Sequence, residues 1–498
     1  MDKKLRDSLQ RFNSTLDKKC SILSIILAAG HGKRIKSERS KMLHTIWGKP
    51  SVTRVCEAVQ QGLDKHNQII VVGNKARQVI ETVGRQDNTI YAVQEEQNGT
   101  GHATQIALES LNRSFTQSLE TIFVFPADMG LISAEAVRKT KEDFFNSDLD
   151  MIIMTGTYNG VPEENYYGRI VRVPNTDING TPSSRAGDVI EIIEFKDILS
   201  LDPHTPYRVD HHGQTYQFTR QELLEIPEFN AGVYGFKANA LFDNINKIEA
   251  DNIQQEFYLT DLVSILNHNG HKIGISRAED DAAILGFNIK SVLKAMESIA
   301  RNRVYEKLKD IITIEDNEYF FIDDAVVERI LELDKKGQAV DIVIGAGVYL
   351  GKSVHIKKGV IIEKNTHIDG TVFIDEYTHI GSACSMDNYP GQKITIGRHC
   401  QLLTGTVIRG EVTIGDNVNI ESGVRITGNS EYPVSIEENV LIKGTTYIFG
   451  SYIEKDVEIE HSILKQKRVE RIEKKDGSIQ AIRYCLPLPE GLDSLSSL

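Results

Sequence analysis

A short segment near the N-terminus combines small residues with two cations. Residues 22–27 form an apolar, β-branched run of strand length, and the small residues after it are Ala28, Ala29, Gly30 and Gly32. Small residues let backbone N–H groups approach an anion closely. The cations Arg34 and Lys41 follow, the first able to fork onto a phosphate and the second a point charge. These features predict a cradle for a triphosphate, although a tight turn with two solvated basic residues would look similar. The spacing fits neither the dinucleotide fingerprint nor the P-loop.

A second candidate for chemistry is an acid that follows an apolar run. Asp128 comes shortly after the run at 121–125, so we expect it at the carboxyl end of a strand, facing the loop at Gly30. A carboxylate there could hold a metal ion. It could equally cap a helix.

The elements that must position these residues alternate between short apolar runs and helical stretches. Residues 21–290 show this pattern, with runs at 68–72, 121–125, 151–154 and 272–275. The alternation predicts an α/β domain with a largely parallel sheet. Ligands of such sheets bind outside the carboxyl ends of the strands, where the glycine loop should lie.

Beyond residue 338 the hydrophobic period changes to six. Aliphatic residues recur at this spacing from Ile344 to Ile380, from Ile396 to Ile426 and from Ile436 to Ile448. Strict hexapeptide periodicity predicts a parallel β-helix, in which each six-residue face turns one aliphatic side chain inward. The two breaks, at 387–393 and 428–433, predict loops that protrude from the coil corners.

The chain therefore divides into five predicted parts. They are an amphipathic helical extension (1–20), the α/β domain (21–290), a helical connector (291–338), the β-helix (339–464), and a hairpin with a tail (465–498).

Composition limits the function classes. Acidic residues outnumber basic ones, 70 to 57, and the net charge of −13 argues against a general role on nucleic acids or membrane surfaces. Phosphate binding would therefore need a few placed cations. No apolar run approaches the roughly 18 residues of a membrane span. Five cysteines without C-x-x-C spacing predict reduced thiols and a cytoplasmic location.

The glycine loop also resembles a family signature. Leu27–Arg34 is similar to L-A-A-G-x-G-x-R, which is followed by P-K in sugar-1-phosphate nucleotidyltransferases; Lys41 matches the lysine, and Ser40 replaces the proline. Within that family the chain looks most like the uridylyltransferase half of bacterial UDP-N-acetylglucosamine pyrophosphorylase. The resemblance implies a Rossmann-like nucleotidyltransferase domain followed by a left-handed parallel β-helix. It also implies Mg²⁺-dependent transfer of UMP from UTP to N-acetylglucosamine-1-phosphate.

The resemblance assigns roles residue by residue. Arg34, Lys41 and Asp128 would be catalytic, and Asp128 and Asn288 would hold Mg²⁺, whose preferred ligands are hard oxygens. Asn288 matches the family's G-x-N motif, and without the resemblance it would be interpreted as an N-cap. The implied nucleotide contacts are Leu27, Ala28, Ala29, Gly30, Gly32, Gln94, Gly99, Thr100 and Ala127, of which three lie in the match to Q-x-x-Q-x-G-T-x-H-A at 94–103.

On the sugar side the resemblance implies Gly168, Glu194 and Asn230 as ligands, with the motif at 256–261 shaping the same pocket. The segments 174–187 and 198–228 are longer than the family's corresponding loops. They could form a lid, alter the choice of sugar, or decorate the surface.

The β-helix carries only an echo of the family's acetyltransferase motif. Asn388–Lys393 has Pro390 in place of the aspartate, and histidines 355, 367, 379 and 399 lie outside the family's context. We therefore expect the coil to serve assembly, as a homotrimer by the resemblance, and we favour this role over acetyl transfer to glucosamine-1-phosphate.

Two further functions are compatible with the motifs. The chain could catalyse the same reaction on another hexose-1-phosphate, such as glucose-1-phosphate, or it could be a non-catalytic regulatory or scaffold subunit. The presence of Arg34, Lys41, Asp128 and Asn288 counts against a non-catalytic subunit, in which the cations and the aspartate would be expected to be lost.

Overall fold

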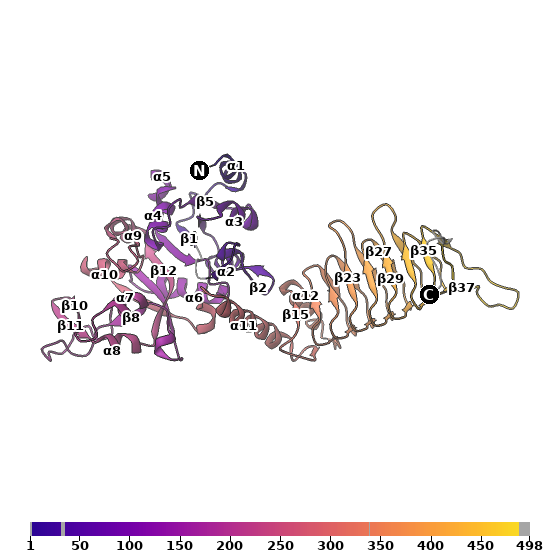
Figure 1. The fold of residues 1–498 in the computed structure, drawn as a ribbon. Coiled ribbons are helices and arrows are strands. Elements are labelled where there is room, and N and C mark those ends of the chain that lie inside the picture. The colour runs from indigo at the N-terminus through magenta and orange to yellow at the C-terminus, as the bar shows by residue number, and fades with distance from the viewer. Residues whose placement is uncertain (1, 31–34, 338, 488–498) are drawn as a thin grey trace, which may run out of the picture. The chain divides into compact units, whose positions relative to one another are not determined.

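The computed structural model describes residues 2–30, 35–337 and 339–487 (Figure 1). The chain forms two compact units, residues 1–297 and residues 298–498. Helix α11 (Lys290–Leu308) runs across the boundary between them. Each unit is described by itself below.

The first unit is built on a nine-stranded sheet in the order β13-β7-β12-β6-β1-β4-β5, with β8 attached to β12 and β9 to β8. Strand β12 runs antiparallel to β6 and β7, whereas β6, β1, β4 and β5 are mutually parallel, as are β7 and β13. The predicted mostly parallel α/β sheet is therefore confirmed. The strands are β1 (Ile22–Ala28), β4 (Asn67–Val72), β5 (Thr89–Val93), β6 (Thr121–Pro126), β7 (Met151–Thr157), β8 (Arg169–Arg172), β9 (Val189–Ile193), β12 (Glu228–Lys237) and β13 (Ile273–Arg277).

Helices cover both faces of this sheet, because its central strands are apolar on both sides. Along β1, Ile25 faces one buried cluster with α4, α9 and α10, while Ile26 faces a second cluster with α2, α3 and α6. The helices are α1 (Lys3–Phe12), α2 (Ser51–Leu63), α3 (Ala76–Val83), α4 (Thr100–Glu109), α5 (Arg113–Thr116), α6 (Ala134–Phe145), α9 (Ala238–Asn244) and α10 (Asp261–His268). Short elements complete the unit: η2 (Lys41–Leu43), β2 (Thr45–Ile46), β3 (Lys49–Pro50), η3 (Pro162–Glu164), η4 (Ile245–Lys247) and η5 (Asp281–Ile284).

The N-terminal extension packs on the edge of the sheet. Leu5, Leu9 and Phe12 of α1 pack against the second cluster. Behind the helix, Asn13 Oδ1 accepts from the backbone N of Tyr91 at 2.8 Å, and Ser14 Oγ accepts from the N of Thr89 at 2.7 Å. The extension therefore covers polar backbone groups of β5, which ends the sheet.

The long segment after β9 folds as a small layer with its own core. It contains α7 (Phe195–Ser200), the antiparallel hairpin of β10 (Tyr207–His211) and β11 (Gln214–Phe218), and α8 (Arg220–Glu225). Ile198, Tyr216 and Leu223 pack together with Val171 and Ile190 of the adjoining strands β8 and β9. The segment is therefore folded and packs as an integral part of the first unit.

The second unit is a stack of parallel strands in three sheets, consistent with the left-handed β-helix of hexapeptide repeats (Figure 1). Val343 pairs with Ile361 and Ile361 with His379, so a complete coil advances three hexads. Ile344, Ile362 and Ile380 are fully buried at the inward positions, as the period of six predicts. The two predicted loops leave the coil between β23 and β24 and between β29 and β30.

The strands of the three sheets are short. The first sheet comprises β14 (Thr313–Ile314), β16 (Val343–Ile344), β19 (Ile361–Ile362), β22 (His379–Ile380), β25 (Gln401–Leu402), β28 (Asn419–Ile420), β31 (Leu441–Lys443), β34 (Glu458–Glu460) and β37 (Ile482–Arg483). The second comprises β15 (Phe321–Ile322), β17 (Tyr349–Leu350), β20 (His367–Ile368), β23 (Ser385–Asp387), β26 (Val407–Arg409), β29 (Arg425–Thr427), β32 (Tyr447–Phe449) and β35 (Ile463–Lys465). The third comprises β18 (Val354–Ile356), β21 (Val372–Ile374), β24 (Ile394–Ile396), β27 (Val412–Ile414), β30 (Val434–Ile436), β33 (Tyr452–Ile453) and β36 (Arg468–Val469).

The coil extends beyond residues 339–464 at both ends. Strands β14 and β15 fall within the segment expected to be a connector, and they pair with β16 and β17; α12 (Asp324–Asp334) follows them. At the other end, a bridge between Glu473 and Ile479 forms the turn at Gly477, and β37 then returns to pair with β34. Residues 488–498 of the predicted tail lie outside the described part of the chain.

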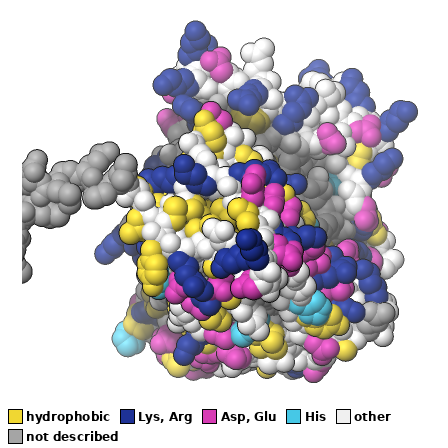
Figure 2. All heavy atoms as spheres, turned by 90° about the vertical axis from the view of Figure 1, so that its right-hand side faces the viewer, with side chains coloured by type: hydrophobic (Ala, Val, Ile, Leu, Met, Phe, Trp, Pro, Cys, Tyr) yellow, Lys and Arg dark blue, Asp and Glu magenta, His cyan; other side chains and the backbone are white. Residues whose placement is uncertain are grey.

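The surface near the last coils mixes charges of both signs. Figure 2 shows Lys and Arg side chains interspersed with Asp and Glu on the face it presents. In the last coils, Arg468 lies 2.7 Å from Glu454, Arg471 lies 3.0 Å from Asp456, and Arg483 lies 3.0 Å from Glu460. Among the described helices, none combines the length and the apolar character that crossing a bilayer would require.

Candidate active site

Four parallel strands of the first unit end at one edge of the sheet. Ala28 lies beside Val72, Leu27 beside Pro126, and Val72 beside Val93, so the residues that follow β1, β4, β5 and β6 are neighbours. The loop at Gly30, the glycine Gly73, the amide Gln94 and the acid Asp128 follow these strands. The sheet therefore brings the predicted phosphate loop, base loop and metal carboxylate to the same edge.

Two of the predicted residues lie outside the described part of the chain. Gly32 and Arg34 fall in the segment 31–34, for which the structure gives no description. The predicted guanidinium contact with phosphate remains a prediction.

Lys41, Asp128 and Asn288 meet although they are far apart in sequence. The Nζ atom of Lys41 donates to Asp128 Oδ2 at 2.5 Å and to Asn288 Oδ1 at 2.6 Å. The Lys41 side chain is 7% exposed and that of Asp128 is 18% exposed, so the pair is largely shielded from water. The ring of Phe287 lies 5.6 Å from Nζ. The Lys41 ammonium therefore contacts one side-chain oxygen each of Asp128 and Asn288 at a position that is largely shielded from water.

Local structure fixes the three side chains. Lys41 begins the short helix η2, and Ser40 before it has φ −57°, the angle that proline would impose. Asn288 lies just ahead of α11, whose residue Glu297 accepts from the backbone N of Trp47 at 2.9 Å. Gly286 approaches Asp128 so closely that a Cβ there would lie 3.3 Å from its carboxylate.

The oxygen donors suit a hard divalent cation. Asp128 and Asn288 offer a carboxylate and an amide oxygen within reach of one point. Among the described residues, no group of three or more His, Cys, Asp or Glu side chains is placed to hold a metal ion. A metal bound by Asp128 and Asn288 would therefore keep several ligands from water or a bound phosphate, which is the usual situation of Mg²⁺.

The predicted base loop is held against a distant segment. Gly99 has φ +104°, and a Cβ there would lie 2.5 Å from the carbonyl oxygen of Phe257. Phe257 N donates to Asn98 O at 2.8 Å, and Leu259 N donates to Thr100 Oγ1 at 3.1 Å. The motif at 256–261 therefore supports the loop at 94–103 directly.

The side chain of Gln94 is buried within this loop. Its Nε2 donates to the carbonyl of Gly99 at 3.2 Å and lies 3.0 Å from His102 Nδ1. Ala127 is also buried; its N–H donates to Leu27 O at 3.1 Å, and its carbonyl accepts from Ser51 Oγ at 2.8 Å. Gln94 and Ala127, which were predicted to contact the nucleotide, therefore also stabilise their own loops.

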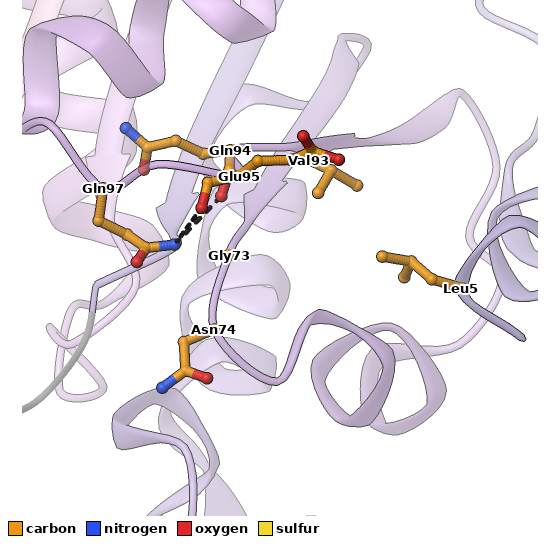
Figure 3. A pocket seen from close by; sticks show the side chains of 7 residues that line it. All are labelled: Leu5, Gly73, Asn74, Val93, Gln94, Glu95 and Gln97. Atoms are coloured by element: carbon orange, nitrogen blue, oxygen red, sulfur yellow. Dashed lines mark hydrogen bonds between the residues drawn. The ribbon is translucent and has the colours of Figure 1, made fainter. Parts of the chain in front are cut away.

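A pocket of about 390 Å³ adjoins the base loop (Figure 3). It is lined by Leu5, Gly73, Asn74, Val93, Gln94, Glu95 and Gln97. Gln97 Nε2 donates to the carbonyl of Gln94 at 3.1 Å, and a Cβ on Gly73 would clash with Ala29 O and with that amide. The N-terminal helix, through Leu5, therefore reaches the surroundings of the predicted nucleotide loops.

The predicted sugar residues also lie together. Asn230 N donates to Gly168 O at 2.9 Å, and a Cβ on Gly168 would lie 3.1 Å from Glu194 Oε1. The Asn230 amide is engaged within the protein, since Nδ2 donates to Tyr234 Oη at 2.7 Å and Oδ1 accepts from Gly232 N at 2.8 Å. Burial, together with Asp197 and Asp261, raises the pKa of Glu194 to about 7. Its charge therefore responds to a neighbouring cation or hydrogen-bond donor near neutral pH.

Two residues next to Gly168 make contacts that the sequence motifs did not assign. Tyr167 stacks on Phe229 with centroids 4.6 Å apart, and its hydroxyl donates to Gly286 O at 3.3 Å, so it links the predicted sugar-binding residues to the segment of the predicted metal ligand Asn288. Arg169 is fully buried; it donates to the carbonyls of Tyr167, Pro162 and Leu224, and the last of these joins it to the long inserted segment. Tyr167 and Arg169 flank Gly168, and only Gly168 was assigned a role from the sequence.

Two family models match the chain. One, described as a MobA-like NTP transferase domain, matches residues 24–169, and one described as a bacterial transferase hexapeptide with six repeats matches residues 393–428. Residues 24–169 of the first unit are thus similar to a MobA-like NTP transferase domain, and residues 393–428 of the second are similar to transferase hexapeptide repeats. These matches confirm the predicted resemblance and the predicted fold class of each part.

Curated relatives of the chain carry the name "Bifunctional protein GlmU". The protein of that name from Acetivibrio thermocellus is 34% identical over 307 residues, covering 61% of this chain and 57% of its own length. That from Caldanaerobacter subterraneus subsp. tengcongensis is 33% identical over 304 residues, covering 61% and 57%. That from Streptomyces avermitilis is 30% identical over 342 residues, covering 67% and 62%. The chain thus matches less than two thirds of the length of these relatives.

Proposed function

We propose that this protein transfers a nucleotidyl group from a nucleoside triphosphate to a sugar-1-phosphate and releases pyrophosphate. The favoured substrates are UTP and N-acetylglucosamine-1-phosphate, and the favoured metal is Mg²⁺. The observation that carries the proposal is the convergence of Lys41, Asp128 and Asn288 at the edge where the glycine loop ends β1.

The reaction needs little acid or base assistance, because the nucleophile is already an anionic phosphate oxygen. That oxygen attacks the α-phosphorus, and the bond from the α-phosphorus to the bridging oxygen breaks, so that pyrophosphate leaves with the electron pair. The demands are in-line positioning and neutralisation of charge. A fixed cation such as Lys41 meets the second demand where the site is shielded from water.

Each group of residues has a part in this scheme. The loop at Leu27–Gly30 would bind the phosphates through its backbone, and Arg34 would add a guanidinium. Gln94, Gly99 and Thr100 would contact the base, with Gly73 leaving room beside Ala29. When bound by Asp128 and Asn288, a divalent metal ion would neutralise phosphate charge and orient the triphosphate.

The sugar phosphate would bind on the side of Gly168, Glu194 and Asn230. Their mutual contacts support one pocket, and Tyr167 connects it to Gly286 beside the metal ligands. The segment 198–228 packs on β8 and β9 next to this pocket, so it would influence the choice of sugar.

A coupled pyrophosphate assay tests the proposal. The purified chain is given Mg²⁺ with UTP, dTTP or ATP and a panel of sugar-1-phosphates that includes N-acetylglucosamine, glucose and galactose. We expect the highest kcat/KM for UTP with N-acetylglucosamine-1-phosphate. Preference for another sugar would keep the reaction and correct the substrate. No pyrophosphate from any pair, together with no UTP binding by calorimetry, would favour a non-catalytic subunit.

We propose that the second unit assembles the protein as a homotrimer through the flat faces of its coil. Outward positions near the start of the coil carry apolar side chains, with Ile361 and Phe373 each 37% exposed. Acetyl-CoA consumption with glucosamine-1-phosphate, measured separately, tests the less favoured idea that the coil is itself catalytic.

A further inference from the structure

The position of the Lys41 ammonium carries a consequence for metal binding. Nζ lies between the oxygens of the two proposed metal ligands, 2.5 Å from Asp128 Oδ2 and 2.6 Å from Asn288 Oδ1. At these distances both contacts are direct hydrogen bonds. The ammonium therefore uses the same oxygen atoms that a metal ion would need.

A metal ion and the ammonium would compete for these oxygens. Mg²⁺ binds oxygen at about 2.0–2.1 Å, so a metal ion on either oxygen would stand less than ~5 Å from Nζ. The side chain of Lys41 is 7% exposed, and little water is present to screen the repulsion between the two charges. The ammonium and a metal ion therefore compete for this position.

We propose that Lys41 fills the metal position between Asp128 and Asn288 until the nucleotide binds, and that the metal–triphosphate complex displaces it. This inference rests on the proposed function, since it takes Asp128 and Asn288 as the metal ligands. The triphosphate supplies the oxygens to which the released ammonium moves, so Lys41 exchanges one set of anionic partners for another. Metal alone offers the ammonium no new partner.

Two consequences follow. The free protein binds a divalent cation weakly on its own, and the substrate is the metal–nucleotide complex. Nucleotide and metal also bind with positive coupling, because the lysine that blocks the metal is the lysine that the phosphates attract. Lys41 thereby keeps the site neutralised in the absence of substrate and neutralises phosphate in its presence.

The test is the affinity for Mn²⁺ alone, measured on the full chain by electron paramagnetic resonance without nucleotide or sugar. For Lys41→Met we expect a Kd for Mn²⁺ at least ~10-fold lower than for the unmodified chain, because the competing cation is gone. Adding Asp128→Asn to Lys41→Met should abolish this gain. The matched control is Lys141→Met, which removes a 2.7 Å ion pair with Asp64 elsewhere in the same unit and should leave the Kd unchanged.

A Kd for Lys41→Met within twofold of the unmodified value, or higher, overturns the inference, as does the absence of measurable binding by both proteins. If Lys41→Met fails to fold, Lys41→Gln, whose neutral amide removes the competing positive charge, replaces it with the same expected gain. Folding is read from Trp47, the single tryptophan, which is buried in this unit. The Mn²⁺ measurement contains no substrate, so an unchanged Kd would overturn this inference without any effect on pyrophosphate release. Failure of the proposed function would instead appear as no pyrophosphate release with any sugar phosphate.

Discussion

Ser40 shows at the scale of one residue how a departure from the family pattern is tolerated. The family places proline before the catalytic lysine, and serine holds the same backbone angle here, with φ −57°. The following helix η2 therefore still directs Lys41 toward Asp128. Serine in place of proline therefore changes the conformational entropy of the unfolded chain more than the geometry of the folded site.

We predict that Ser40→Pro is compatible with the site and stabilises the first unit. Proline at an angle it already favours lowers the entropy of the unfolded chain, which is worth about 0.4–1 kcal/mol. Urea unfolding followed by Trp47 fluorescence measures the gain, and pyrophosphate release should stay within about twofold. A loss of stability would show that the Ser40 N–H or its hydroxyl has an essential partner.

The individual residues of the candidate site were largely predictable, but their contacts were not. Lys41, Asp128 and Asn288 each occur in a short motif, and motif matching assigned each a role. That Lys41 bridges the other two depends on η2, β6 and the start of α11 meeting in space, which no local pattern encodes. Tyr167 and Arg169 were passed over because their hydrogen bonds go to backbone carbonyls, which any sequence offers.

At the scale of elements, the N-terminal extension has a role beyond packing. Asn13 and Ser14 place side-chain oxygens on the backbone N–H groups of Tyr91 and Thr89 along β5. Helical spacing predicted α1, but the polar residues Asn13 and Ser14 after it resemble those of an ordinary linker. Their hydrogen bonds to β5 could therefore not be predicted from the sequence.

We predict that Asn13→Ala destabilises the first unit by about 1–3 kcal/mol, because it leaves the buried N–H of Tyr91 without its acceptor. Urea unfolding monitored by Trp47 measures the loss. Arg11→Ala on the adjoining helix is the control and should cost less than about 0.5 kcal/mol. Equal effects of the two substitutions would contradict an edge-capping role.

Strand β9, on which the inserted segment packs, carries a buried acid that makes stability depend on pH. Burial raises the pKa of Glu191 to about 7, against a partial opposing effect of the Tyr207 hydroxyl, which donates to its Oε2 at 3.0 Å. The folded state therefore holds this proton more tightly than the unfolded state, whose glutamates titrate near 4.3. The stabilisation by this proton is fully present below the unfolded-state pKa of about 4.3, and it is lost as the pH rises through the folded-state pKa of about 7.

We predict that Glu191→Gln stabilises the first unit at pH 8 by about 1–3 kcal/mol and has little effect at pH 4.5. Glutamine stays neutral and still accepts from Tyr207. Unfolding by urea at several pH values measures the difference, with Glu109→Gln on the exposed end of α4 as control. A variant that is no more stable than the parent at pH 8 would show that the carboxylate is already well solvated.

The β-helix was predictable because its inward aliphatic residues repeat every six positions. Its ends were not predictable because this period is absent there. Inward positions from Ile344 onward keep a period of six over many coils, so chance cannot imitate it. Strands β14 and β15 are two residues long and are interrupted by α12, which leaves no period to detect. The first strands of the coil were therefore assigned to the connector.

At the scale of the whole molecule, we expect the two units to divide the work, with chemistry in the first and assembly in the second. Ile414 is 1% exposed and stacks between Ile396 and Ile436, so Ile414→Asp places a carboxylate in the apolar column of the coil. We predict loss of the β-type circular dichroism of the coil and loss of the trimer in sedimentation. Trp47 unfolding and kcat for pyrophosphate release should remain within about threefold of the parent values. A matching collapse of kcat would place part of the active site in the coil.

The proposed nucleotidyl transfer depends on Lys41 and Asp128 acting on the triphosphate. The most direct measurement is kcat for pyrophosphate release from UTP and N-acetylglucosamine-1-phosphate by Lys41→Ala and Asp128→Asn, with Lys141→Ala as control and Trp47 fluorescence to verify folding. Removing groups that stabilise transferring charge typically costs factors of about 10² to 10³. We predict a loss of at least that size for both variants and none for the control. Release at nearly the parental rate by either folded variant would contradict the assignment of this site.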